Sequence, residues 1–78
     1  MNGDPVQRVI DARDLEPPEP FVLMMEALDA CRSGESVLLL LGREPYPLYA
    51  ALERNGFSHQ TQRRPDGTVE ILSWRKGP

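Results

Sequence analysis

Hydrophobic residues along this 78-residue chain change their spacing several times, and each change predicts a new element. Residues 6–12 are rich in β-branched side chains, which predicts a first strand. From residue 19 the apolar positions recur every three or four residues, which predicts an amphipathic helix. Its expected buried stripe consists of Phe21, Met24, Met25, Leu28 and Cys31. We expect the helix to end at Ser33-Gly34, with the glycine in the left-handed conformation.

Residues 36–41 are apolar at nearly every position, so both faces of this segment are expected to be covered. This predicts a central strand that runs parallel to the first and is joined to it by the helix. A second helix of about nine residues is predicted next, with Pro47 in its first turn and Asn55-Gly56 at its end. Its buried stripe is expected to be Leu48, Ala51 and Leu52.

The last third of the chain predicts a β-hairpin. Segments 57–63 and 68–74 flank Arg64-Pro65-Asp66-Gly67, a sequence typical of a type I turn followed by a left-handed glycine. The element order is therefore βαβαββ. We predict an α+β two-layer sandwich, with a four-stranded mixed sheet and both helices on one face, because two helices can cover only one face of so small a sheet. The 78 residues are expected to form one domain with a core at about 6–76 and short flexible ends.

The predicted sheet has more apolar residues than one buried face requires. Leu38 and Leu40 alternate with Val37, Leu39 and Leu41, and Leu72 and Trp74 alternate with Val69 and Ile71. One set must therefore lie on the face without helices, and periodicity leaves open which one. Exposed apolar patches often mark interaction surfaces, so Leu38, Leu40, Leu72 and Trp74 are candidates for binding a protein partner or a second copy. The alternative is a sheet face that is merely half-buried.

Composition and charge narrow the classes of partner. The chain is 40% hydrophobic and 27% charged, as in ordinary soluble domains. Four basic and ten acidic residues fall in 1–53, whereas five basic and two acidic residues fall in 54–78. The net charge of −3 argues against a general nucleic-acid surface. RNA binding through a basic hairpin (Arg63, Arg64, Arg75 and Lys76) is kept as an alternative.

The expected location is cytoplasmic, without membrane contact. The amino-terminal residues lack the basic and apolar regions of a signal peptide, and the longest apolar run, 37–41, is too short to cross a bilayer. Cys31 is the single cysteine, so neither an internal disulfide nor a cysteine pair for zinc is possible. We expect no metal and no cofactor.

Asp11-Ala12-Arg13-Asp14-Leu15-Glu16-Pro17-Pro18-Glu19-Pro20 resembles the start of the first helix in the TusA/SirA-like sulfur-carrier family. In that family an Asp-x-Arg-x-Leu run leads into Cys-Pro-x-Pro, and Pro17 stands here in place of the cysteine. Ser33-Gly34-Glu35 is similar to the family's turn between helix and strand, and Pro45-x-Pro47-Leu48 looks like the branch of unknown function that lacks the carrier cysteine. The resemblance covers residues 9–76 and implies a TusA/SirA-like fold. It also implies a sulfur, nitrogen-oxide or haemerythrin-like context.

Proline at position 17 has no thiol, so the persulfide chemistry of the carriers cannot occur there. Pro17, Pro18 and Pro20 also lack N–H donors, and the glutamates beside them add negative charge, so an anion would be poorly bound at this helix start. We interpret the segment first as a rigid structural start of the helix. The alternative is a binding loop that uses Asp11, Arg13 and Glu16.

Catalytic residues are not predicted. Cys31 could act as a displaced sulfur acceptor in a sulfurtransferase relay, but its place on the apolar stripe favours a core residue. His59 is the only histidine and has no acid or second ligand at a suitable spacing, which favours a histidine on the strand surface.

We therefore predict a small non-catalytic binding or accessory domain. It is expected to bind an unknown protein partner, or a second copy of itself, through the open sheet face and the loops at residues 13–19 and 43–46. The candidate binding residues in and beside these loops are Asp11, Arg13, Glu16, Pro17, Pro18, Pro20, Pro45 and Pro47. A sulfur relay through Cys31 and RNA binding through the hairpin are the alternatives.

Overall fold

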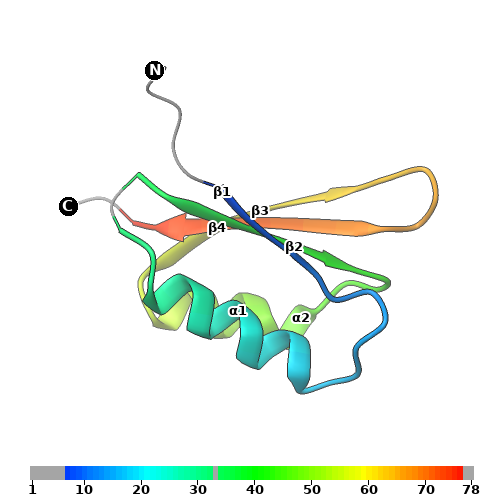
Figure 1. Cartoon of the computed structure of the whole chain (residues 1–78), viewed down its shortest axis with the longest axis horizontal. Helices are drawn as coiled ribbons and strands as arrows, with labels where there is room; N and C mark the ends of the chain where they lie inside the picture. Colours follow the sequence, from blue (N-terminus) through cyan, green and yellow to red (C-terminus); the bar gives the residue numbers. More distant parts are fainter. Residues whose placement is uncertain (1–6, 33, 77–78) are drawn as a thin grey trace.

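The elements follow the predicted βαβαββ order in the computed structural model, which describes residues 7–32 and 34–76. They are β1 (Gln7–Asp11), α1 (Glu19–Asp29), β2 (Ser36–Leu41), α2 (Tyr46–Arg54), β3 (Phe57–Arg63) and β4 (Val69–Arg75) (Figure 1). Two residues used in the sequence predictions, Val6 and Ser33, lie outside the described residues.

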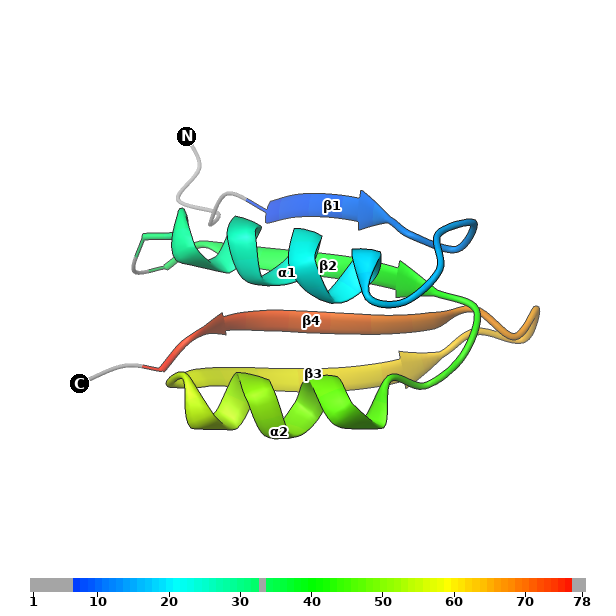
Figure 2. The ribbon, with the colours of Figure 1, turned by 90° about the horizontal axis from the view of Figure 1, so that it is seen from below.

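The four strands form one mixed sheet in the order β1-β2-β4-β3. β2 runs parallel to β1, as predicted, and β4 runs antiparallel to both of its neighbours. Both helices cover the same face of the sheet, α1 beside β1 and β2, and α2 beside β3 (Figures 1 and 2). The predicted α+β two-layer sandwich is therefore confirmed.

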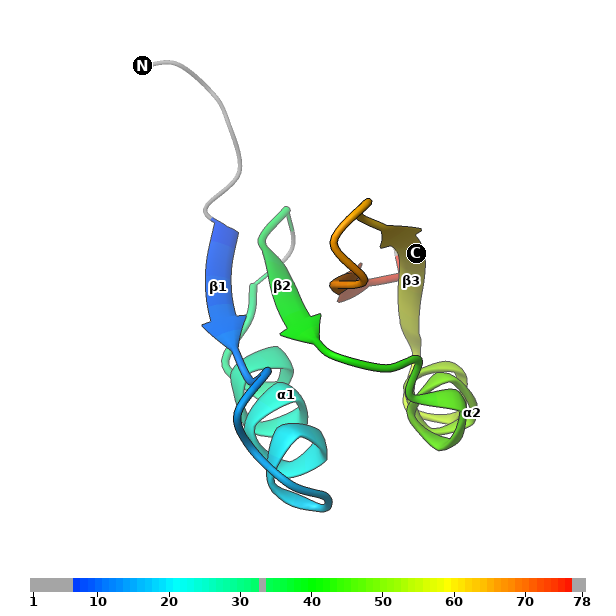
Figure 3. The same cartoon turned by 90° about the vertical axis from the view of Figure 1, so that its right-hand side faces the viewer.

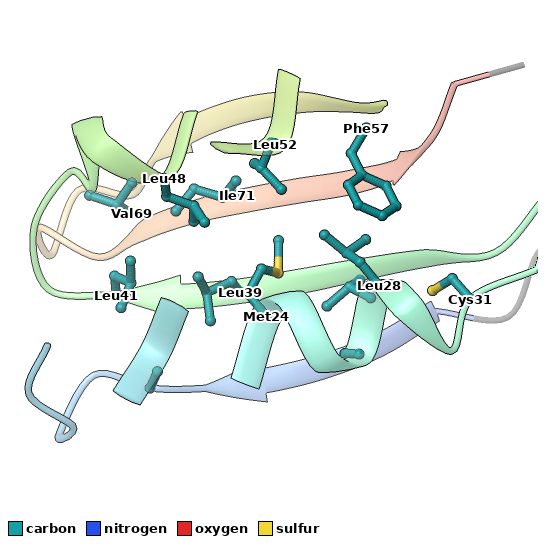
Figure 4. Close-up of a cluster of buried hydrophobic side chains, with 13 residues drawn as sticks. Met24, Leu28, Cys31, Leu39, Leu41, Leu48, Leu52, Phe57, Val69 and Ile71 are labelled. Carbon is teal, nitrogen blue, oxygen red and sulfur yellow. The ribbon is translucent and has the colours of Figure 1, made fainter. Parts of the chain in front are cut away.

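The core lies between the helices and the two central strands. Strand pairing places Leu39 of β2 opposite Ile71 of β4. Met24 of α1 and Leu52 of α2 approach this pair from the helical layer, and all four side chains are fully buried (Figure 4). Burying a side chain of this size contributes about 1.5–3 kcal/mol, so these contacts supply much of the stability of so short a chain.

α1 buries most of its predicted stripe, because Met24 and Leu28 are fully buried and Met25 packs against the core, but Phe21 departs from the prediction. Pro20, Met24, Ala27 and Leu28 face the sheet, whereas Phe21 is 39% exposed. Because Pro20 occupies the buried position in the first turn, the stripe runs through positions four, seven and eight residues later. The neighbouring position, Phe21, is consequently turned out of the core.

The predicted end of α1 was also wrong. The helix stops at Asp29, and Cys31 lies beyond it, with its N–H donating to the Leu28 carbonyl at 3.0 Å. Gly34 does adopt a positive φ of 90°, but it lies in the connection after the helix and not at its C′ position. At this end, the Arg75 guanidinium of β4 donates to the carbonyl oxygens of Leu28 and Cys31, both at 3.3 Å, and of Asp29 at 3.4 Å. The carbonyls of Asp29 and Cys31 thereby gain a side-chain donor, and the Leu28 carbonyl gains a second donor beside the Cys31 N–H.

The second helix and the hairpin agree closely with the sequence pattern. α2 ends at Arg54 with Asn55 as its C-cap, and Gly56 follows at a φ of 83°. In the hairpin turn the Gly67 N–H donates to the Arg64 carbonyl at 3.0 Å, and Gly67 has a φ of 93°. A positive φ suits glycine at both positions because it has no Cβ to clash.

The apolar set left open by the sequence is now assigned. Val37, Leu39, Leu41, Val69 and Ile71 face the helices and are buried. Leu38 and Leu72, which are paired across β2 and β4, point to the opposite side and are half-buried. We call this side the open face; its apolar residues are Val9, Leu38, Leu40, Leu72 and Trp74. Of the four residues proposed for an exposed patch, Leu40 is buried and the other three are half-buried.

Candidate functional site

A groove lies at the carboxyl ends of the parallel strands β1 and β2. Two loops leave the sheet there: residues 12–18 lead to α1, and residues 42–45 lead to α2. Seen along the strands, the first loop passes in front of α1 and the second crosses toward α2 (Figure 3). Between them is a cavity of about 770 Å³, a volume within the roughly 300–1,000 Å³ typical of ligand sites.

Most of the lining is apolar. The floor comes from the ends of core elements, where Leu39, Leu41 and Leu48 reach the groove. The remaining lining residues come from the two loops and the helix starts: Ala12, Arg13, Asp14, Leu15, Glu16, Pro17, Pro18, Pro20, Phe21, Gly42, Arg43, Glu44, Pro45 and Pro47. The groove thus offers a contiguous apolar surface edged by charges.

Seven of the eight loop residues selected from the sequence meet in this groove: Arg13, Glu16, Pro17, Pro18, Pro20, Pro45 and Pro47. The eighth, Asp11, lies at the end of β1 on the side of the open face. Its carboxylate accepts hydrogen bonds from Arg13 Nε at 2.8 Å and Nη2 at 2.7 Å. These hydrogen bonds lower the pKa of Asp11 from 3.8 to about 2. Asp11 is therefore connected to the groove through its ion pair with Arg13.

The sequence interpretation missed Phe21 as a groove residue, because its spacing fitted the core stripe. Its position in the first turn of α1 was the available signal: side chains on a helix lean toward its amino terminus, so a first-turn residue extends over the preceding loop. Leu15 was known only as part of the family pattern, and it lines the groove and packs against the core.

The second loop is tied to α2 and β3 through Glu44. Its carboxylate accepts hydrogen bonds from the Arg63 guanidinium and from the Tyr49 hydroxyl, the latter at 3.1 Å. The Tyr49 hydroxyl also lies 2.7 Å from Thr61 Oγ1. Burial raises the pKa of Tyr49, which keeps the hydroxyl protonated and able to donate. Glu44 therefore fixes one rim of the groove.

The His59 side chain has two contacts that the sequence did not predict. Its ring stacks on Tyr49 with centroids 4.7 Å apart, and Nε2 lies 3.5 Å from Glu53 Oε2. The residue is half-buried on the helical side of β3. His59 lies on strand β3 as expected, but it is half-buried and not on the surface, because α2 packs over β3 and brings Glu53 close.

Cys31 lies far from the groove. Figure 4 shows Cys31 and Leu41, a floor residue of the groove, at opposite ends of the core. Cys31 is only 9% exposed. Its thiol and the ring of Pro17 are therefore at opposite ends of α1.

The basic residues of the hairpin do not gather. β3–β4 pairing places Arg63 opposite Val69 and Arg75 opposite Phe57, so the two ends are separated by about 20 Å at roughly 3.3 Å per residue. Arg63 pairs with Glu44, and Arg64 pairs with Glu70. The basic hairpin of the RNA-binding alternative therefore does not form one cationic cluster.

The described residues contain no group of three or more histidine, cysteine or acidic side chains placed to hold a metal ion. Within residues 7–32 and 34–76, no helix has the length and apolar character needed to cross a membrane.

Comparison with known proteins gives the family. A family model described as "Uncharacterized conserved protein (DUF2249)" matches residues 9–75, which is most of the chain. The chain belongs to the DUF2249 family. Its fold is similar to the crystal structure of a SirA-like protein from Desulfitobacterium hafniense, with a TM-score of 0.78 and 21% identity over 88% of this chain and 97% of the other. The expected SirA-like fold is thus confirmed for this DUF2249 member. No curated protein matches the sequence.

Proposed function

We propose that this DUF2249 chain is a non-catalytic binding module whose groove receives an apolar segment of a partner protein. The observation that carries this proposal is the cavity of about 770 Å³ formed where the loops 12–18 and 42–45 meet. Its floor is continuous with the core, so the apolar surface is held in place without a partner. Preformed, mostly apolar concavities with a few polar groups are typical of binding sites.

The chemistry of the lining is compatible with binding. The described lining residues include carboxylates and guanidinium groups but no thiol, hydroxyl or imidazole that could act as a nucleophile or be activated as one. Pro17, at the position that matches the cysteine of the carriers, contributes a ring to the wall. The site therefore combines a SirA-like fold with a groove whose described lining contains no thiol.

Photo-crosslinking can test the proposal with a matched pair of neighbours on α1. Phe21 and Val22 are 39% and 45% exposed, and only Phe21 lines the groove. Each position is replaced in turn by p-benzoylphenylalanine in the full chain, which is then irradiated in its native host. We expect a discrete adduct from position 21 and a much weaker one from position 22. Equal labelling from the two positions would contradict the proposal.

A third probe at Val9 covers the open face. Val9 is 56% exposed and lies beside Leu38 on that face. If position 9 crosslinks a partner and position 21 does not, binding occurs on the open face and the groove proposal is wrong. The mass of each adduct distinguishes a second copy of this chain from another protein.

A further inference from the structure

The charges around the groove define the kind of segment that it would accept. Two of the charged lining residues are already paired within the fold: Arg13 with Asp11, and Glu44 with Arg63. Internal pairing satisfies these groups, so they are poorly placed to select a ligand. The selectivity of the groove then depends on the charges that remain.

Three charged lining residues have no ion-pair partner within residues 7–32 and 34–76: Asp14, Glu16 and Arg43. All three are exposed. The two acids belong to the loop before α1, and the arginine belongs to the loop before α2. These loops leave the sheet in different directions (Figure 3), so the unpaired charges of the groove are two carboxylates on one rim and one guanidinium on the other.

Backbone pairing with a ligand is restricted by the prolines. Pro17, Pro18, Pro20, Pro45 and Pro47 all line the groove and have no N–H to donate. An added strand would lack regularly spaced donors there, so recognition by strand addition is disfavoured. A small anion would likewise find few donors beside two unpaired carboxylates. Recognition must come mainly from buried apolar side chains and from the charges at the rims.

We propose that the groove binds an extended peptide segment whose apolar side chains are flanked by a basic group on one side and an acidic group on the other. The basic group lies beside Asp14 and Glu16, and the acidic group lies beside Arg43. This inference rests on the proposed binding function and adds the chemistry of the bound segment. For an exposed ion pair, each contact changes affinity by about 1.5- to fivefold.

Substitution of Arg43 tests the role of the rim charges. It is exposed and has no ion-pair partner in the described part of the chain, so Arg43→Glu should leave the fold intact while making all three unpaired rim charges negative. Lys76→Glu is the matched control, because Lys76 is also exposed but follows β4 at the end of the sheet away from the groove. Circular dichroism checks that both variants fold.

The probe is a displayed library of random heptapeptides, selected at low salt on the immobilised full chain. Wild type and Lys76→Glu should enrich apolar residues between one basic and one acidic residue. Arg43→Glu should lose the acidic preference and enrich basic residues on both sides. In fluorescence polarisation, an enriched peptide should bind Arg43→Glu about 1.5- to fivefold or more weakly than wild type, with the difference shrinking in high salt.

Two outcomes would overturn the inference: wild type enriching no peptides, or Arg43→Glu retaining the acidic preference. The crosslinking experiment separates this failure from failure of the proposed function. A selective adduct at position 21 together with either of these outcomes would support the proposed binding function but contradict the proposed charges of the bound segment. Loss of both signals would remove both proposals.

Discussion

Replacing Arg75 with methionine should destabilise the domain by detaching β4 from the end of α1. The guanidinium donates to three carbonyl oxygens, those of Leu28, Asp29 and Cys31, and its central carbon lies 5.3 Å from the centroid of the Phe57 ring. The last turn of α1 itself contains no basic residue. Arg75 therefore supplies the favourable charge at this helix terminus from another element.

The expected loss is about 1–2 kcal/mol in the free energy of unfolding. Interaction with the helix dipole contributes about 0.3–1 kcal/mol, and the cation–π contact contributes about 0.5–1 kcal/mol. The hydrogen bonds, at 3.3–3.4 Å, are longer than the common range, so their contribution to the free energy of unfolding is expected to be small. In a domain of this size each kcal/mol lowers Tm by about 4–8 °C.

Urea unfolding followed by circular dichroism and by the fluorescence of Trp74, the single tryptophan, measures this loss. Coincident transitions would support two-state behaviour. Lys76→Met removes an adjacent exposed cation and should change stability by no more than about 0.5 kcal/mol. If Arg75→Met and Lys76→Met are equally stable, Arg75 does not secure the end of α1 and the reasoning fails.

Three further outcomes are expected. The folded pKa of Asp11, about 2, lies below its ordinary value of 3.8, so its contact with Arg13 stabilises the fold above about pH 4 and loses this effect as the pH falls toward 2. Arg13→Ala should raise the pKa of Asp11 toward 3.8 in a carboxyl NMR titration, and an unchanged pKa would show that another group lowers it. Cys31 should react with a thiol reagent or a persulfide donor only as urea unfolds the chain, whereas rapid reaction of the native protein would favour the sulfur relay. Met24→Ala should cost about 2–5 kcal/mol in urea unfolding and Val22→Ala at most about 0.5 kcal/mol, because Met24 is fully buried and Val22 is 45% exposed; similar losses would mean that α1 packs through another face.

Local features of the fold could be predicted from the sequence because they depend on short-range patterns. The apolar run at residues 36–41 predicted β2 (Ser36–Leu41) to the residue, and Arg64-Pro65-Asp66-Gly67 predicted the hairpin turn. The prolines before each helix also pointed to the two loops of the candidate site. Turn residues and hydrophobic periodicity act within a few neighbouring positions, so they can be read without knowing the rest of the molecule.

The sequence by itself determined the element order and the helix-covered mixed sheet, and it places a proline at position 17. Only the tertiary structure decided that Leu38 and Leu72 face away from the helices, that Phe21 leaves the core and that Arg75 secures the end of α1. It also brought the loops 12–18 and 42–45 together around one groove. These features depend on contacts between elements that are far apart in the sequence. The hydrophobic pattern of the sequence indicates which residues are buried, but it does not indicate which element packs against them.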